Sequence, residues 1–79
     1  MPDQRATSKA HWGRAYQQFR KRLVSARESA GLTQRDAARH LGRSQSFVAK
    51  SESGERRVDV VELTQFAALY RKPVGFFVP

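Results

Sequence analysis

The residues with the clearest chemistry form a short polar group in the middle of the chain: Ser44, Gln45, Ser46 and Lys50. The sequence predicts that a helix begins here and exposes these side chains on its first turns. A glutamine can form two hydrogen bonds with adenine, and a lysine can donate to the acceptors of guanine. The group therefore suits the edges of base pairs. By composition alone, it would also suit an ordinary solvated helix face.

Two short helices, separated by a tight turn, are predicted to position these polar residues. Thr33 is expected to cap the first helix, with Asp36 as its partner in a capping box. Gly42 ends that helix, because glycine adopts the left-handed C-cap conformation without steric cost. Ser44 caps the second helix and Gly54 ends it. Two helices joined by a glycine turn within about twenty residues have the spacing of a helix-turn-helix.

Two longer amphipathic helices are predicted on either side of this pair. The first runs from about Ala15 to Ala30, and the second starts at a cap formed by Asp59 and Glu62. A last short turn is expected after Pro73. The residues expected to face inward are Tyr16, Phe19, Leu23, Ala26, Ala30, Val60, Leu63, Phe66, Ala67 and Tyr70. The predicted fold is all-α, a compact four- to five-helix domain.

The net charge of +8 is unevenly distributed along the 79 residues. Residues 1–30 hold seven basic and two acidic residues, and residues 31–57 hold six and three. Residues 58–79 hold two of each and are neutral. A basic field of this kind suits nucleic acid, because binding releases counterions condensed on the phosphates. An anionic membrane surface is the weaker alternative, because no helix face carries bulky apolar anchors.

The domain organisation is predicted as a flexible basic arm over residues 1–14 and one folded domain over residues 15–79. The arm is either a disordered terminus or a segment that touches phosphates or the minor groove. Trp12 within it is expected to pack somewhere, as lone tryptophans in small domains usually do. With no cysteine, secretory signal or apolar span, the sequence favours a cytoplasmic protein.

Catalysis and metal binding have little support in the sequence. His40 lies one helical turn from Asp36, but no nucleophile motif surrounds them. His11 and His40 lack the spacing and partners of a metal site. We therefore expect no enzyme activity, no cofactor and no metal.

The segment GLTQRDAARHLGRSQSFVAKSESGERR resembles the Cro/phage-repressor type of helix-turn-helix, the XRE family with a lambda-repressor-like fold. The matching features are the GLTQ opening, the LG turn, the SQSxVxK helix, the ExG ending and the ERRxD continuation. The similarity extends over roughly residues 19–77. It implies sequence-specific binding of double-stranded DNA, with the second helix of the motif in the major groove. It also implies a homodimer on a palindromic operator and a role as a repressor or autoregulator.

The resemblance further assigns roles to individual residues. The expected base contacts are Ser44, Gln45, Ser46, Phe47 and Lys50. The expected contacts to the DNA backbone are Gln34, Arg43, Ser53, Arg56 and Arg57. For Phe47 the alternative is packing against another helix. Arg27 and Glu52 are expected to form an ion pair, so that Arg27→Ala should lower the melting temperature and Arg22→Ala, at an exposed position, should not.

Several alternatives remain open at this stage. Phe76 and Phe77 are the candidate dimer interface, unless their rings pack into the core of the monomer. Ala37 and Ser51 stand where the family usually has larger apolar residues. Either Trp12, Tyr16 or Phe47 fills the space, or the domain is less stable than its relatives. The chain could instead be an antitoxin-type partner of a toxin, or a module that binds another regulatory protein.

Overall fold

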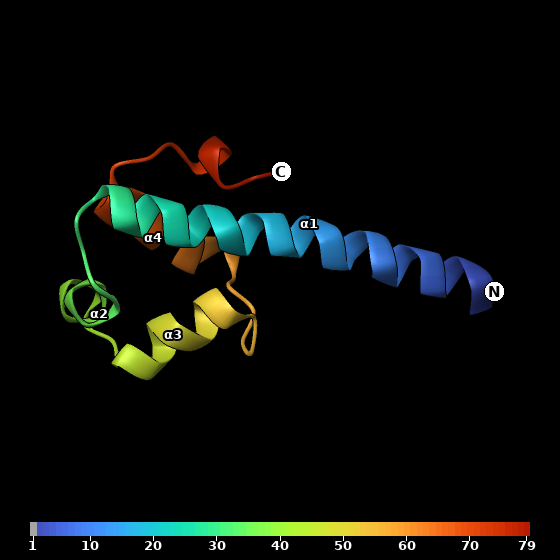
Figure 1. The fold of residues 1–79 in the computed structure, drawn as a ribbon, viewed down its shortest axis with the longest axis horizontal. Helices are drawn as coiled ribbons and strands as arrows, with labels where there is room; N and C mark the ends of the chain where they lie inside the picture. The colour runs from blue at the N-terminus through green and yellow to red at the C-terminus, as the bar shows by residue number, and fades with distance from the viewer. Residues whose placement is uncertain (1) are drawn as a thin grey trace.

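The computed structural model describes residues 2–79, with side chains from Gly13 onward, and this part of the chain is entirely helical without strands. Figure 1 shows one long helix with the shorter helices packed along its C-terminal half. The elements in order are α1 (Pro2–Ser29), α2 (Gln34–Leu41), α3 (Gln45–Ser53), α4 (Val60–Tyr70) and the 3₁₀ turn η1 (Val74–Phe76). The predicted all-α fold with four to five helices is confirmed.

Each of the three short α-helices begins at the cap predicted from the sequence. The Thr33 hydroxyl accepts from the Asp36 backbone N–H at 3.0 Å, and the Asp36 carboxylate accepts from the Thr33 N–H at 3.1 Å. Ser44 caps α3 by accepting from the N–H of Phe47. Asp59 and Glu62 form the same reciprocal box at the start of α4. Side-chain oxygens thus satisfy backbone donors that a helix start leaves without partners.

Gly42 and Gly54 end α2 and α3 in the left-handed conformation, with φ of 66° and 87°. At Gly54 the space is also restricted, because a Cβ would lie 2.9 Å from the Nε of Arg20. Arg20 donates to the carbonyl oxygens of Glu52 and Ser53 at 3.1 and 2.9 Å. A side chain from α1 therefore closes the C-terminus of α3 and ties the two helices together.

The core lies where α1, α2, α3 and α4 meet. Its buried apolar residues are Phe19, Leu23, Ala26, Ala37, Ala38, Val48, Phe66, Ala67, Tyr70 and Phe77. Two predicted inward residues are wrong. Val60 is 71% exposed, because it lies in the first turn of α4 before the stripe meets the core. Ala30 is exposed because α1 ends at Ser29.

The start of the first helix differs from the sequence prediction. A helix was expected from about Ala15, whereas α1 begins at Pro2 and its N-terminal half extends beyond the other helices (Figure 1). Proline is tolerated at a helix start, because its missing N–H has no partner there in any case. The side chain of Trp12 lies outside the described residues. Independent movement of the basic segment 1–14 stays a prediction.

The C-terminal tail folds back over α1 and corrects two predictions. Phe77 is fully buried in the core of the monomer, so it cannot be an exposed dimer contact. Phe76 is half-buried and meets Phe77 edge to face, with ring centroids 5.2 Å apart. Arg22 is not a free surface residue, because its guanidinium donates to the carbonyl oxygens of Phe76 and Val78. Arg22→Ala is therefore unsuitable as a neutral control.

Candidate nucleic-acid interface

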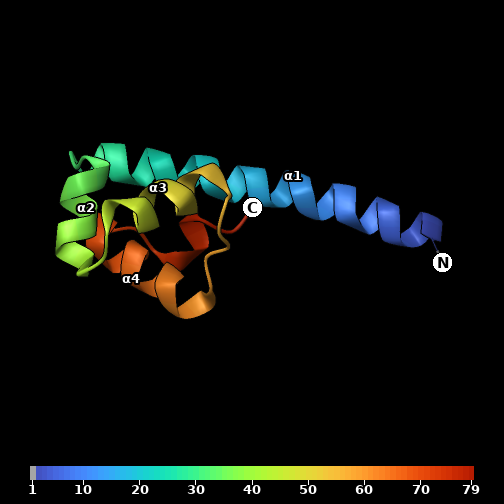
Figure 2. The same cartoon turned by 90° about the horizontal axis from the view of Figure 1, so that it is seen from below.

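Helix α3 exposes its polar residues on the outer surface of the domain. Val48 and Ser51 are fully buried and hold one face of α3 against the core. Ser44, Gln45, Ser46 and Lys50, the expected base contacts other than Phe47, are exposed. In Figure 2 this helix lies in front of α1, next to α2. The structure therefore places Ser44, Gln45 and Ser46 at an accessible helix start and Lys50 further along the same helix, with side chains that can donate to and accept from base edges.

A buried ion pair joins α1 to α3 behind this surface. Arg27 Nε donates to Glu52 Oε2 at 2.7 Å and Arg27 Nη2 donates to Oε1 at 3.2 Å, which is the two-point geometry that guanidinium groups favour. The side chains are only 12% and 6% exposed. Hydrogen bonding to Glu52 raises the pKa of Arg27 despite its burial. The predicted pairing is present, and it fixes the distance between the two helices.

The same carboxylate also holds Gln34, the residue expected to meet a DNA phosphate. Gln34 Nε2 donates to Glu52 Oε1 at 2.8 Å, while Arg27 Nη1 donates to the carbonyl oxygen of Leu32. Glu52 thus connects α1, the start of α2 and the end of α3. Gln34 is half-buried rather than free, and its amide orientation is set by this bond. Its contact with phosphate stays a prediction.

Phe47 packs against another helix, which is the alternative to a base contact. Its ring stacks on Phe66 of α4, with centroids 5.9 Å apart and an interplanar angle of 10°. The guanidinium carbons of Arg43 and Arg56 lie 4.2 and 4.4 Å from the centroid of Phe47. Cations above an aromatic ring are attracted by its quadrupole. Phe47 is therefore half-buried between a core ring and two arginines.

Glu62 of α4 balances the charge of these two arginines. Arg56 binds its carboxylate through two bonds of 2.9 Å, and Arg43 Nη2 lies 3.6 Å from Oε2. Arg56 also donates to the buried hydroxyl of Ser51, which itself donates to the carbonyl oxygen of Phe47 at 2.7 Å. Hydrogen bonds from Arg56 lower the pKa of Glu62 and keep it ionised. The buried hydroxyl of the small Ser51 is thus held by polar contacts with Arg56 and with the backbone of Phe47.

The remaining predicted backbone contacts lie near the end of α3. Ser53 is exposed and its hydroxyl donates to the carbonyl oxygen of Lys50. Arg57 is exposed, with its guanidinium carbon 4.3 Å from the ring centroid of Tyr16. Tyr16 in turn accepts a hydrogen bond from the N–H of Val58 at 2.9 Å. Arg57 is therefore available to solvent but directed by a contact with α1.

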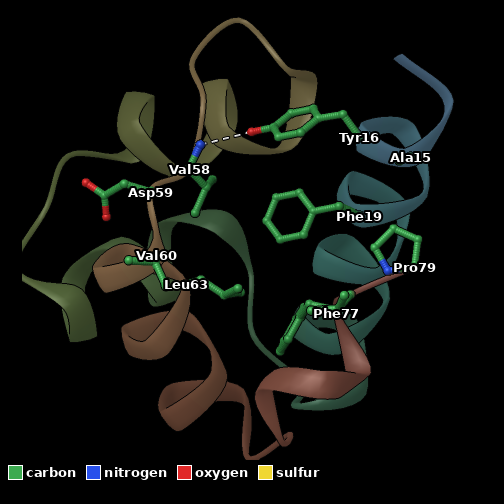
Figure 3. Close-up of a pocket in the computed structure, with 10 residues that line it drawn as sticks. Ala15, Tyr16, Phe19, Val58, Asp59, Val60, Leu63, Phe77 and Pro79 are labelled. Atoms are coloured by element: carbon green, nitrogen blue, oxygen red, sulfur yellow. Dashed lines mark hydrogen bonds between the residues drawn. The ribbon is translucent and has the colours of Figure 1, made fainter. Parts of the chain in front are cut away.

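An apolar groove lies beside this loop, between α1, the start of α4 and the C-terminal tail (Figure 3). It encloses about 320 Å³ and is lined mainly by carbon atoms. Phe19 and Phe77 form its floor in Figure 3, and the Tyr16–Val58 hydrogen bond closes one end. Val60 and Val78, 71% and 54% exposed, lie at its edges. The groove is an apolar surface formed partly by α1 and largely by residues 58–79, the segment without net charge.

Sequence reasoning did not identify the long-range contacts of Arg20 and Arg22, or the ion pairs of Glu62. Helical periodicity puts Arg20 and Arg22 off the inward-facing stripe of α1. Their partners lie 32 to 56 positions away along the chain. No local pattern reveals such contacts. For Glu62 the capping box was visible in the sequence, but its two arginine partners were not.

Within the described side chains, no group of three or more potential metal ligands is found. No helix in the described part of the chain is long and apolar enough to cross a bilayer.

A family model of helix-turn-helix domains matches residues 18–74. An XRE-family like protein from Pseudomonas syringae pv. tomato str. DC3000 has a similar structure, with a TM-score of 0.84 and 38% sequence identity. The match covers 90% of this chain and 87% of that one. A comparison with curated proteins finds no match. The chain belongs to the helix-turn-helix domain family and is of the XRE type, which makes it a DNA-binding transcription regulator.

Proposed function

We propose that this protein is a sequence-specific repressor or autoregulator that places α3 in the major groove of its operator. The proposal is supported above all by the polar residues that α3 exposes. Gln45 and Ser46 lie at its start and Lys50 in its last turn, and the buried Val48 holds the helix against the core. A helix fits the major groove, where each base pair presents a distinct pattern of donors and acceptors. The basic charge of residues 1–57 supports binding to the phosphates on either side.

Gln45→Ala tests the readout, using a duplex that the wild-type protein selects from a random-sequence pool and a shuffled duplex. We expect the variant to lose about 10- to 100-fold of the preference for the selected duplex, as one two-point base contact contributes. Affinity for the shuffled duplex should hardly change, because phosphate contacts supply it. Binding is measured by fluorescence anisotropy across a salt series.

Gln65→Ala is the matched control, because Gln65 is also an exposed glutamine but lies on α4. It should retain the wild-type preference. If Gln45→Ala retains the preference too, Gln45 is not a base contact. If the wild type prefers no sequence in the pool, the specific-repressor proposal is wrong, and a protein partner becomes the better candidate.

We also propose that the regulator acts as a homodimer, with a second copy covering the apolar groove. One small module reads few base pairs, and dimers on two half-sites are the common solution. Two copies of a chain with net charge +8 repel each other, but residues 58–79, which form much of the groove, are neutral. Val60 at its edge is apolar and 71% exposed. Burying such surface in a dimer would remove it from water.

Val60→Glu is expected to shift the protein from dimer to monomer in sedimentation equilibrium without DNA. The new carboxylate would be buried in the contact, yet it favours the N-terminus of α4 in the monomer. Val61→Glu is the control, because Val61 is 61% exposed and does not line the groove. A wild type that stays monomeric at every concentration, or equal effects of both variants, would contradict dimerisation through this groove.

A further inference from the structure

Arg43 and Arg56 differ in how completely Glu62 binds them. Arg56 uses both terminal nitrogens on the Glu62 carboxylate and donates to Ser51 as well. Arg43 approaches the same carboxylate with one nitrogen, at 3.6 Å. A guanidinium has five N–H donors, so most of those on Arg43 remain available. Its side chain is also the more exposed of the two, at 44% against 32%. Arg43 is therefore the arginine that can still bind a phosphate.

The position of Arg43 is restricted from three sides. Its backbone N–H donates to the carbonyl oxygen of Ala38 at 2.9 Å, which fixes the turn between α2 and α3. The ring of Phe47 lies under its guanidinium group at 4.2 Å. The carboxylate of Glu62 attracts it from α4. Because Phe47 lies in the first turn of α3, the guanidinium of Arg43 lies beside the exposed helix start.

We infer that Glu62 is a positioning residue for DNA recognition, which holds Arg43 over Phe47 so that it meets a phosphate in one register relative to α3. Phosphate contacts orient a protein on the duplex, and base contacts then read the sequence. A fixed Arg43 would align Gln45 with its base pair. An Arg43 without its counter-charge would still bind phosphates, but in several positions. The inference rests on the proposed function, because it concerns the alignment of α3 with a specific site.

The test compares Glu62→Gln with the wild type on the selected and shuffled duplexes. Glutamine keeps an oxygen to cap the Asp59 N–H but removes the charge that attracts Arg43. We expect the preference for the selected duplex to fall about tenfold, within the range of coupled neighbouring residues. Affinity for the shuffled duplex should stay equal or rise, because Arg43 remains charged. Thermal unfolding, followed by circular dichroism, shows that the variant is folded at the assay temperature.

Glu55→Gln is the matched control, because it removes the same charge from the loop after α3. Glu55 is exposed, and its carboxylate forms no ion pair among the described residues. This variant should change the affinity for the selected and the shuffled duplex by the same factor and leave the preference unchanged. If Glu62→Gln behaves in the same way, Glu62 acts through net charge alone and the inference is overturned.

A double-mutant cycle that combines Arg43→Gln with Glu62→Gln separates a positioning effect from a loss of stability. It remains informative even if Glu62→Gln is less stable than the wild type. Arg43→Gln removes the exposed arginine and should lower the salt slope by about one. In that background, adding Glu62→Gln should change the preference no further, because its effect passes through Arg43. If Glu62→Gln lowers the preference for the selected duplex as much in the Arg43→Gln background as in the wild type, the inference is overturned. A wild type without any preference would overturn the proposed function and the inference together, whereas a preference that Glu62→Gln leaves intact overturns the inference alone.

Discussion

Arg27→Ala is expected to lower the free energy of unfolding by about 3–5 kcal/mol, because it leaves Glu52 as a buried charge without its ion-pair partner. The carboxylate is only 6% exposed in the native structure, so it is shielded from bulk water. Gln34 would remain as a neutral donor to Glu52, which is weaker than the charged pair. For a small domain, whose total stability is about 5–15 kcal/mol, this is a large fraction. Urea unfolding measures it.

Lys21→Ala is the control for this prediction, because Lys21 lies exposed on the same helix. It should change the free energy of unfolding by less than about 0.5 kcal/mol. Replacing both partners, as Arg27→Met with Glu52→Leu, should recover part of the loss, since no isolated charge is then buried. Equal stabilities of Arg27→Ala and Lys21→Ala would show that the pair contributes nothing.

Phe77→Ala is expected to lower the free energy of unfolding by about 3–5 kcal/mol, the usual cost of removing a buried aromatic ring. Phe77 is fully buried, and in Figure 3 its ring lies with Phe19 at the floor of the groove. The cavity would lie between α1, α4 and the tail, where the surrounding backbone can close only partly. Thermal and urea unfolding at low protein concentration measure this loss in the free energy of unfolding for the monomer.

Phe76→Ala provides the comparison, because it removes the same ring one position earlier. Phe76 is half-buried and has the ammonium of Lys72 5.0 Å from its centroid, so part of its surface already faces water. We expect it to cost less than half as much as Phe77→Ala. If the two variants are equally stable, the buried ring of Phe77 contributes no more to the core than the half-buried ring of Phe76, and the prediction is wrong.

Local features of the fold could be predicted, because each is set by neighbouring residues. The capping boxes at Thr33 and Asp59, and the left-handed glycines at 42 and 54, depend on side chains within three or four positions. The amphipathic stripes gave most of the core correctly. The prediction that Val60 faces inward was wrong. Periodicity shows which face of a helix a residue lies on, but not where along that helix the neighbouring helix begins to cover it.

The candidate site was predicted only in part. The exposed start of α3 follows from the positions of Ser44, Gln45 and Ser46 on a capped helix, and the resemblance supplied the pairing of Arg27 with Glu52. The partners of Arg43 and Arg56 did not follow from either. In the structure both lie over Phe47 and face Glu62, and their expected contacts with the DNA backbone stay predictions.

The order of residues alone therefore determines the helices, their caps and the polar surface of α3, because those features depend on short-range sterics and hydrogen bonds. The tertiary structure decides which charges are neutralised and which remain available to DNA. Glu62 meets Arg56 six positions away and Arg43 nineteen away only because α4 packs against α3 through Phe66 and Phe47. Likewise, Arg20 and Arg22 can donate to the carbonyl oxygens of Glu52 and Phe76 only because the end of α3 and the tail lie beside α1. Long basic side chains can find many partners, and the packing of the helices selects among them.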